Sequence, residues 1–475
     1  MRRRASPGQR LRLLGLAGLG LAAGLAVMAA LALPRLTGFA PAAGALEVST
    51  RARVQVFFDR PMDPDAVAAA WQITPAVPGT LTWEDAGATL TFTPHQAWPA
   101  TSAVTVSVTG GRSQLGLPLL GTATWSFTIG QERLVLLAGG APNLAALSLA
   151  AGAQPIYLTA ETYGVADFTV HPDGSVIVYA ARRADGGADL RAVPAGGGAA
   201  QPVLACPEAA CVSPVFSPDG LQLAYERQTP LATAGGDAGY GDPRLHVLTL
   251  ATGADRTVGE AANPARWPRW APDGRLSYYD ALRQAVVVTD LATGAVTYIP
   301  STSGEPGAFL ADGQTYIFAE ITYLDNAITL GETLAVTDNV DVEVAGFYSH
   351  LRRVTVATNV VTDLSGPGVV EDAAPVYSVA GDWLAFGRRP LVGLDWQPGR
   401  QLWLMRPDGT DPHPLTSAPD YHHSAFRWSP DGRRLAYMRY NVIDPNQPAE
   451  IWLINSDGTA ARQLTTGGYL PEWLP

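Results

Sequence analysis

Two adjacent histidines, His422 and His423, follow Asp420 and Tyr421 immediately before a segment of alternating apolar residues. Imidazole, carboxylate and phenol groups together are common components of proton-transfer and ligand-binding sites. Adjacent side chains of an extended segment point to opposite faces, so both histidines cannot easily bind one metal ion, and we predict no metal site. Two interpretations stay open: a ligand site, or solvated loop residues with one histidine packed inside.

Charged and aromatic residues precede or begin several other alternating segments in the same way. They are Asp167, Arg266, Trp267, Glu371, Asp372 and Glu472. If these segments converge on one axis, the residues surround a single mixed-charge opening together with the group at 420–423. Such an opening is typical of a site for a small ligand or a peptide. We therefore predict that all ten residues bind a ligand.

The sequence lacks the motifs of common catalytic sites. All 32 basic residues are Arg, which excludes a Schiff-base Lys, a phosphate-loop Lys and a Ser–Lys pair. The Gly-x-Ser-x-Gly, His-Glu-x-x-His and Asp-x-Asp-x-Asp-Gly patterns are missing as well. We therefore expect no catalytic residue and no cofactor.

The N-terminal segment predicts attachment to a membrane. Residues 1–12 contain five Arg and no acidic residue, and residues 13–33 are uncharged and apolar. At 1.5 Å per residue this run would cross about 30 Å of hydrocarbon, with the basic segment in the cytoplasm and the bulk periplasmic or extracellular. The alternative is a cleaved signal sequence and a secreted protein, because Ala30 and Ala32 form a small-residue site. We predict a linker at 34–45.

The charge balance and the cysteines bear on the class of partner and on the cellular compartment. The net charge is −11, which argues against a nucleic-acid partner. Cys206 and Cys211 are the only two cysteines. Outside the cytoplasm such a pair predicts a loop-closing disulfide, and two sulfurs alone cannot form a structural zinc site.

Residues 46–130 alternate in a way typical of a half-buried antiparallel sheet. Val54, Val56 and Phe58 share one face of a segment, and Leu90 and Phe92 share one face of another. Short segments of this kind, separated by Pro and Gly turns, predict a β-sandwich. Three carboxylates near the first segment, Asp59, Asp63 and Asp65, are interpreted as turn caps in preference to a calcium cluster.

This stretch resembles the bacterial Ig-like domains of the SbsA surface-layer type. The similarity lies in Val56 to Asp63, the Ile-Thr-Pro at 73–75, the Leu-Thr-Phe-Thr-Pro at 90–94 and the Trp-Ser-Phe-Thr at 125–128. The resemblance implies a spacer or adhesive module outside the cell.

Residues 131–475 contain an internal repeat. Pro-Asp-Gly turns end at Gly174, Gly220, Gly274 and Gly432, and degenerate copies lie at 310–313 and 379–382. A second hairpin and a short outer strand follow each turn, so the repeat predicts four strands and a β-propeller. Pairing residues 133–158 with the last residues, 469–475, favours seven blades, and six are possible without it. The insert at 320–349 is either a partner-binding flap or a longer hairpin.

At these turns and hairpins the sequence resembles the TolB-like propellers. The small α/β domain that precedes the propeller in TolB itself is missing here, so the resemblance does not extend to partnership with the Tol–Pal system. We expect an all-β protein with an N-terminal transmembrane helix, an Ig-like β-sandwich and a propeller. Its predicted role is a membrane-anchored binding or scaffold protein that recognises a protein, peptide or glycan at the cell envelope. A hydrolase or lyase with its site at the propeller funnel, and a purely structural spacer, are the alternatives.

Overall fold

The structure is a computed structural model that describes residues 33–150, 152–232, 238–323, 346–378, 383–392 and 395–474. The chain divides into two compact units, with the boundary after Gly130. The basic segment at 1–12, nearly all of the apolar run at 13–33, the degenerate turn at 379–382 and most of the insert at 320–349 lie outside the described residues. Within the described ranges, no helix has both the length and the apolar character of a membrane span.

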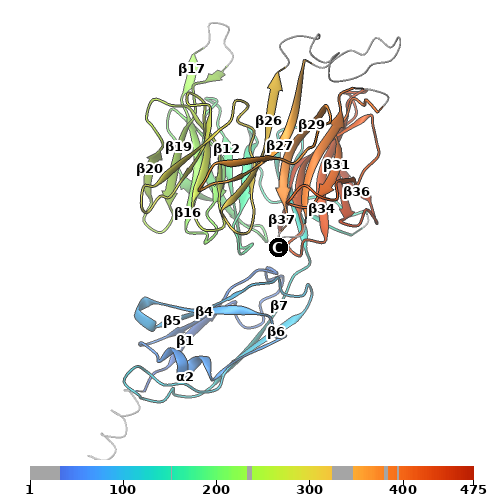
Figure 1. The fold of residues 1–475 in the computed structure, drawn as a ribbon. Helices are drawn as coiled ribbons and strands as arrows, with labels where there is room; N and C mark the ends of the chain where they lie inside the picture. The colour runs from blue at the N-terminus through green and yellow to red at the C-terminus, as the bar shows by residue number, and fades with distance from the viewer. Residues whose placement is uncertain are drawn as a thin grey trace, which may run out of the picture. The chain divides into compact units, whose positions relative to one another are not determined.

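The first unit is a sandwich of two antiparallel sheets (Figure 1). One sheet has the strand order β1 (Leu36–Ala40), β2 (Val54–Phe58), β5 (Thr89–Pro94) and β4 (Gly79–Glu84). The other has the order β3 (Trp71–Thr74), β6 (Ala103–Val108) and β7 (Ala123–Thr128). A short helix, α2 (Pro64–Ala68), and a 3-10 turn, η1 (Asp85–Gly87), connect the strands.

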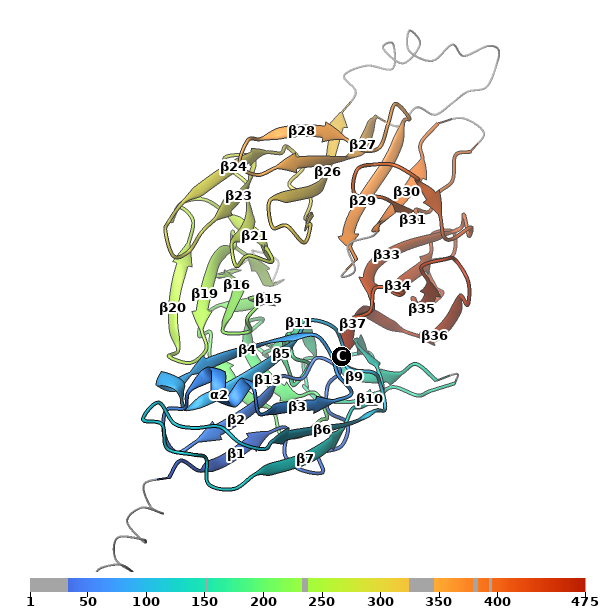
Figure 2. The ribbon, with the colours of Figure 1, turned by 60° about the horizontal axis from the view of Figure 1, so that its bottom comes forward.

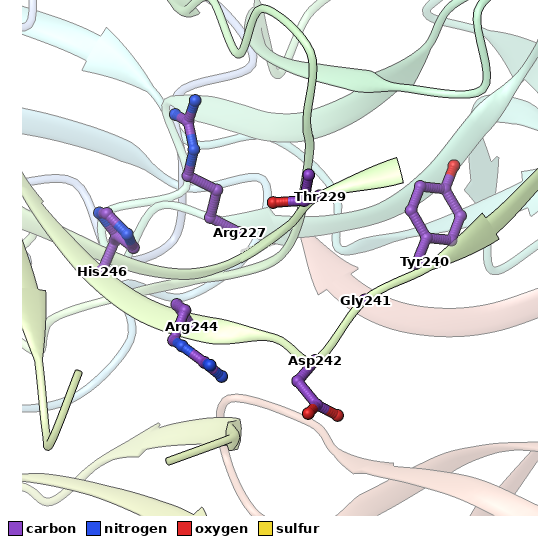
Figure 3. Close-up of a pocket in the computed structure, with 7 residues that line it drawn as sticks. All are labelled: Arg227, Thr229, Tyr240, Gly241, Asp242, Arg244 and His246. Carbon is purple, nitrogen blue, oxygen red and sulfur yellow. The ribbon is translucent and has the colours of Figure 1, made fainter. Parts of the chain in front are cut away.

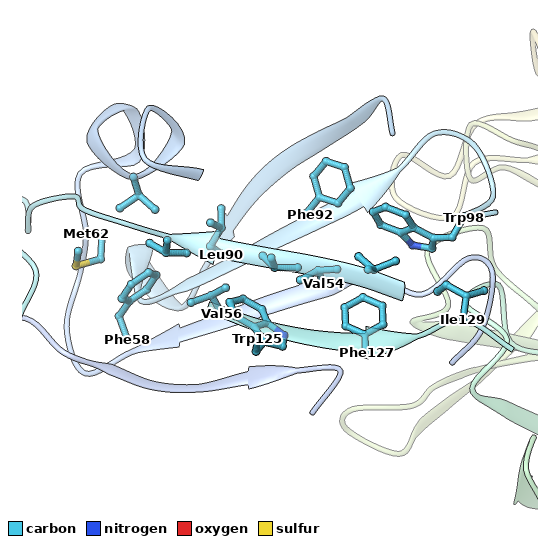
Figure 4. Packing of buried hydrophobic residues seen from close by; sticks show 14 residues of the cluster. Val54, Val56, Phe58, Met62, Leu90, Phe92, Trp98, Trp125, Phe127 and Ile129 are labelled. Carbon is cyan, nitrogen blue, oxygen red and sulfur yellow. The ribbon is translucent and has the colours of Figure 1, made fainter. Parts of the chain in front are cut away.

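The core of this unit lies between the two sheets, as the alternation predicts. Val54, Val56 and Phe58 of β2 are buried against Trp125 and Phe127 of β7 (Figure 4). Trp98 is also buried, and its indole N–H donates to the carbonyl of Ala52 at 3.0 Å. The rings of Trp98, Trp125 and Phe127 therefore contribute apolar area to this core, and the polar atom of Trp98 is satisfied.

Two local features of this unit bear on the sequence predictions. Leu36–Ala40 form the edge strand β1, paired with β2, within the stretch at 34–45 that we expected to be a linker. Asp63 caps α2 by accepting from the amide of Ala66 at 3.3 Å, and it also pairs with Arg112 at 2.8 Å. Asp63 is thus engaged as a cap and an ion-pair partner, in agreement with the interpretation as turn caps.

The second unit consists of antiparallel four-stranded ladders around a central axis, which is the arrangement of a β-propeller (Figure 2). Two of the ladders are joined to the next one by a single parallel bridge each, Ala188 with Ala210 and Ser349 with Glu371. The inner strands, which line the axis, are β11 (Val165–Val170), β15 (Ala210–Phe216), β21 (Ala265–Trp270), β25 (Ala308–Phe309), β29 (Val370–Tyr377), β33 (Tyr421–Trp428) and β37 (Gly468–Leu474).

The remaining strands follow outward in each ladder. The second strands are β8 (Arg133–Ala138), β12 (Val176–Arg182), β16 (Gln222–Gln228), β22 (Leu276–Asp280), β26 (Thr315–Tyr323), β30 (Leu384–Pro390) and β34 (Arg434–Asn441). The outer pairs are β9 (Asn143–Ser148) with β10 (Ile156–Tyr157), β13 (Ala188–Pro194) with β14 (Gln201–Leu204), β19 (Arg244–Thr249) with β20 (Ala254–Val258), β23 (Ala285–Thr289) with β24 (Val296–Pro300), β27 (Phe347–Thr355) with β28 (Val360–Asp363), β31 (Gln401–Met405) with β32 (His413–Pro414), and β35 (Glu450–Asn455) with β36 (Arg462–Thr466). A small hairpin, β17 (Pro230–Ala232) with β18 (Ala238–Tyr240), extends from the connection between β16 and β19.

The two ends of the propeller sequence pair with each other. β37 runs antiparallel to β8, with Trp473 opposite Leu134 and Leu474 opposite Arg133. Trp473 is buried, and its indole N–H donates to the carbonyl of Arg427 at 3.0 Å. The last strand of the chain therefore completes the ladder that the first strands of this unit begin, as the sequence predicted.

The repeated turn forms as its residues predict. Gly220 has φ of 76°, and the Asp219 carboxylate accepts from the Ser217 hydroxyl at 2.6 Å and from the amide of Leu221 at 3.0 Å. These turns occupy one end of the propeller, which we call the turn face. At the other end, the loop face, inner strands begin and second strands end, and β17 and the end of β26 lie there (Figure 1).

Candidate functional site

A channel pocket of about 700 Å³ lies along the propeller axis. It is lined by residues of the seven inner strands and of the segments that lead into them or follow them. Its charged side chains are Asp167, Arg269, Arg427 and Glu472. Trp267 supplies an aromatic wall, so the pocket combines apolar surface with a few polar groups, as ligand sites do.

A repeated bulge in the inner strands determines which side chains face this pocket. The pairing of each inner strand with its second strand shifts by one residue in β11, β15, β21, β29, β33 and β37. In five of these strands a residue in the bulge has a positive φ and lines the pocket, namely Ser213, Trp267, Ala374, Ala425 and Leu470. An extra residue reverses the side-chain alternation beyond it, so the residues that follow the bulge are turned toward the axis.

Arg269, Arg427 and Glu472 occupy the same place in the repeat. Each is the second residue after the bulge residue and directly precedes a Trp. The equivalent positions in the other inner strands also line the pocket and are uncharged, namely Thr169, Val215, Ala308 and Val376. The Trp residues after Arg269 and Arg427 donate to carbonyls of the preceding inner strand, Trp270 to Val215 at 3.0 Å and Trp428 to Val376 at 3.1 Å.

The charged groups of the pocket are partnered unequally. The guanidinium of Arg427 donates to the carboxylate of Glu472 at 2.5 Å, so these two charges neutralise each other. Arg269 donates only to the carbonyl of Pro268, at 3.0 Å, and no carboxylate oxygen of the described residues lies within salt-bridge distance of it. Burial, together with the nearby Arg427, lowers the pKa of Arg269.

Asp167 is the second charged group of the pocket without an ion pair. Its carboxylate accepts from the amide of Phe168 at 2.7 Å, and no basic group of the described residues lies within 4 Å. Burial raises the pKa of Asp167, although Arg269 and Arg427 act in the opposite direction. The channel therefore contains one guanidinium and one carboxylate that do not neutralise each other by direct contact.

Trp267 is held at the pocket wall by two contacts. Its backbone amide donates to the carboxylate of Glu226 at 2.8 Å, and its ring stacks on Tyr279 with the centroids 6.1 Å apart. Glu226 is buried, and burial raises its pKa. Glu226 lies on β16 behind the pocket wall, so it positions Trp267 and does not line the cavity.

The structure places Glu371 and Asp372 in ion pairs outside the pocket. Asp372 is fully buried, and Arg388 donates to both of its carboxylate oxygens at 2.6 Å. The hydroxyl of Ser365 donates to the same carboxylate at 2.5 Å. Glu371 pairs with Arg389 and lies 3.5 Å from Arg400. The partners already present satisfy both carboxylates.

The two histidines also lie outside the channel pocket. Arg400 donates to Nε2 of His422 at 3.0 Å, and burial with the neighbouring Arg400 and Arg389 lowers the pKa of His422 to about 3. His423 is buried, its Nδ1 bonds the carbonyl of Arg400 at 2.9 Å, and burial lowers its pKa to about 4. Both imidazoles are therefore neutral at ordinary pH.

The other predicted residues lie on the surface of the loop face. The Tyr421 hydroxyl donates to Gln447 at 3.2 Å, and the Arg439 guanidinium stacks 4.2 Å above its ring. Asp420 is exposed, and its carbonyl accepts from the amide of Val442 at 2.8 Å. The Arg266 guanidinium lies 3.9 Å from the carboxylate of Asp242.

Three of the ten predicted residues thus line one cavity, and seven do not. Asp167, Trp267 and Glu472 come together in the channel, whereas the residues at 420–423 and the pair at 371–372 are separated from it. Sequence reasoning missed Arg269 and Arg427. The signal that identifies them is their shared position directly before a Trp in the repeat. No group of three or more metal-ligating side chains occurs among the described residues.

The disulfide joins the segment that leads into β15 to the second residue of that strand. Cys206 and Cys211 are bonded to each other, with both side chains buried. The amide of Cys206 donates to the carboxylate of Asp189 at 2.8 Å, which ties the closed loop to the neighbouring β13.

A second pocket, of about 650 Å³, lies on the loop face beside the hairpin of β17 and β18 (Figure 3). Arg227, Arg244, Asp242 and Tyr240 line it, together with Thr229, Gly241 and His246. Arg244 is engaged by the carbonyls of Ala261, Pro243 and Ala262, and His246 lies 3.0 Å from the carboxylate of Asp255. This pocket combines a partly exposed tyrosine ring with the charged side chains of Arg227, Asp242 and Arg244.

Comparison with known proteins identifies the first unit. Residues 32–129 match the family described as bacterial Ig-like domain. No curated protein matches the sequence.

Among solved structures, the chain is similar to TolB from Acinetobacter baumannii, with 14% identity, a TM-score of 0.41, and 86% of this chain and 84% of that chain covered. A putative TolB from Agrobacterium tumefaciens has 16% identity and a TM-score of 0.38, with 71% and 91% covered. An oligogalacturonate lyase from Vibrio parahaemolyticus has 14% identity and a TM-score of 0.39, with 64% and 73% covered. Similarities at this level assign neither an activity nor the role of any residue.

Proposed function

We propose that this chain is a membrane-anchored, extracytoplasmic binding or scaffold protein that recognises a protein, peptide or glycan of the cell envelope through the loop face of its propeller. The apolar run at 13–33 and the Ig-like unit support the location, the first as an anchor and the second as a spacer of the SbsA type. The propeller supports the binding role, because it presents variable connections on a rigid frame.

The observation that carries the proposal is the number of exposed aromatic side chains on the loop face. Six of them are between 39% and 73% exposed and lie where inner strands begin or second strands end, namely Tyr163, Tyr240, Tyr323, Trp396, Tyr440 and Tyr469. The turn face differs: among the described residues of its Pro-Asp-Gly turns, Leu221 is the one exposed large apolar side chain. Exposed aromatic groups in such numbers are typical of interaction surfaces.

The geometry favours binding over the hydrolase or lyase alternative. His422 accepts from Arg400 and His423 bonds a backbone carbonyl, and neither lines the channel. Their low pKa values remove them as general acids near neutral pH. A structural spacer differs from both roles because it predicts that substitutions on the loop face have no effect on binding.

We also propose seven blades for the propeller. Six ladders are built from consecutive strands, from β11 to β36, and a seventh is supported by the pairing of β37 with β8, which β9 and β10 extend outward. The closing ladder leaves no unpaired edge between the first and the last blade.

The binding role is tested by substitution of the aromatic side chains. In the full chain, Tyr163, Tyr440 and Tyr469 are changed together to Ser, and partners retained from envelope extracts are quantified by mass spectrometry. We expect loss of the partners that the wild-type chain retains. In the matched control, Ser replaces the exposed residues Leu221, Val360 and Val361, which lie away from the loop face. We expect this variant to retain the same partners as the wild type. Equal retention by both triple variants would contradict the proposal.

The anchor has its own test. The mass of the protein isolated from membranes distinguishes a retained N-terminus from a mature chain that begins after Ala32. We expect the retained form in the membrane fraction. A shortened protein in the soluble fraction would contradict the anchor and indicate a cleaved signal sequence.

A further inference from the structure

The channel pocket contains two opposite charges that the fold leaves without ion pairs. Arg269 donates to one carbonyl oxygen, and Asp167 accepts from one backbone amide. Their neighbours Arg427 and Glu472 are paired with each other at 2.5 Å. Both side chains are only partly exposed, and an unpaired charge that has lost part of its hydration is costly, so complementary groups of a ligand would stabilise both of them.

The cavity has the size and walls that a small ligand requires. Its volume of about 700 Å³ falls within the range of roughly 300–1,000 Å³ that is common for small-molecule sites. The indole of Trp267 and the side chains of Val215 and Val376 form apolar parts of the wall. The backbone amide of Trp267 donates a hydrogen bond to the Glu226 carboxylate and its ring stacks on Tyr279, so this wall is preorganised.

The two groups select the chemistry of the ligand. A guanidinium recognises a carboxylate through directed N–H donors, and a carboxylate accepts from an ammonium or amine. A ligand with a carboxylate alone would leave Asp167 unpaired and close to a like charge. A ligand with an amine alone would leave Arg269 unpaired and close to the positive charge of the amine. A molecule that carries both groups satisfies both side chains.

We propose that the propeller channel binds a small amino carboxylate, with Arg269 pairing with its carboxylate and Asp167 accepting a hydrogen bond from its amino group. Trp267 contacts the carbon skeleton. This site is separate from the exposed aromatic residues of the loop face and goes beyond the proposed recognition of an envelope partner. Failure of either proposal leaves the other in place.

Binding is tested with a panel that varies the distance between the two groups. The probes are the twenty amino acids and the ω-amino acids from β-alanine to 6-aminohexanoate. Each is added to the full chain in detergent, and the melting temperature and the heat of titration are measured. We expect saturable binding of at least one probe, with a rise in melting temperature. The proposal is overturned if no member of the panel binds at millimolar concentration.

The assignment of groups is tested by matched pairs of probe and variant. For the best probe, the methyl ester removes the carboxylate charge and the N-acetyl form removes the amine. Arg269→Gln should lower the affinity for the probe about 10- to 100-fold, and this variant should bind the probe no more tightly than its methyl ester. Asp167→Asn should bind the probe no more tightly than its N-acetyl form. An ester that binds the wild type as well as the acid does would overturn the role of Arg269.

Two further variants separate binding from folding. Arg269→Lys keeps the positive charge and should retain part of the affinity for the probe. If both Arg269→Gln and Arg269→Lys lose this affinity and their circular dichroism spectra are altered, the cause is a folding defect. Arg227→Gln removes an arginine of the second pocket and should bind the probe as the wild type does. Unchanged affinity in both Arg269→Gln and Asp167→Asn, each correctly folded, would place the probe outside this site.

Discussion

At the scale of single residues, Asp167 is a carboxylate that the fold makes harder to ionise. Burial raises its pKa, so between the unfolded and the folded pKa values the native state binds more protons than the unfolded state does. Its contribution to stability is therefore present at low pH and is lost as the pH rises through the folded pKa. We predict that Asp167→Asn is more stable than the wild type at pH 7, with the difference shrinking toward pH 4. Urea unfolding at both pH values measures this, and a less stable variant at pH 7 would contradict it.

Two neighbouring acidic residues differ in the depth of their ion pairs, which gives a second prediction at this scale. Asp372 is fully buried on Arg388, so Asp372→Asn leaves a buried guanidinium without its countercharge and should cost about 3–5 kcal/mol of unfolding free energy. Glu371 pairs with the partly exposed Arg389, and Glu371→Gln should cost about 0–1 kcal/mol. Chemical denaturation of the two variants compares them directly. Equal losses would mean that burial does not determine the strength of these pairs.

At the scale of the elements, the bulge of the inner strands is a site of backbone strain. Ala425 has φ of 52° in β33, a conformation that disfavours L-residues and suits glycine. Ala425→Gly should therefore stabilise the protein by about 0.5–1 kcal/mol, and Ala425→Val should destabilise it by more than about 1 kcal/mol. The control is Ala436→Gly in the neighbouring β34, where the residue is buried in a regular strand and glycine should destabilise. The same sign at both positions, measured by thermal unfolding, would rule out strain at the bulge.

The elements also show how far the sequence can be interpreted. The Pro-Asp-Gly turns and the alternating segments predicted the sandwich and the propeller ladders, because these depend on local patterns. The pairing of the two ends is not local, and it was predicted from the incomplete repeat units at 133–158 and 469–475. β1 was missed because Leu36–Ala40 lie in a segment rich in Pro, Gly and Ala, whose weak alternation does not distinguish an edge strand from a linker. Asp420 and Arg266 were predicted to surround the opening because they come just before or at the start of an inner strand, and they do not line the pocket. The bulge that follows reverses the side-chain alternation, so Arg269 and Arg427 face the axis instead.

At the scale of the whole propeller, closure by the last strand should be essential for stability. β37 buries Trp473 and Leu474 against the first ladder, and Arg434 pairs with Glu132 between segments that are 302 residues apart. Deletion of residues 469–475 removes this strand and should cost more than about 5 kcal/mol, enough to abolish cooperative unfolding. Differential scanning calorimetry tests this, and addition of a peptide with the sequence of residues 467–475 should restore a transition. A deletion variant that melts like the full chain would contradict closure.

The central claim is that the loop face of the propeller, with its exposed aromatic side chains, binds a partner at the cell envelope. The most direct measurement is photocrosslinking in cells that express the full chain with a benzophenone amino acid at one position. Tyr440 and Trp396 serve as positions on the loop face, and Leu221 and Val360, which are as exposed or more so, serve as positions away from it. We predict a discrete crosslinked species at Tyr440 and Trp396 and none at Leu221 or Val360. Crosslinking at Leu221 or Val360 alone, or at no position, would contradict recognition through the loop face.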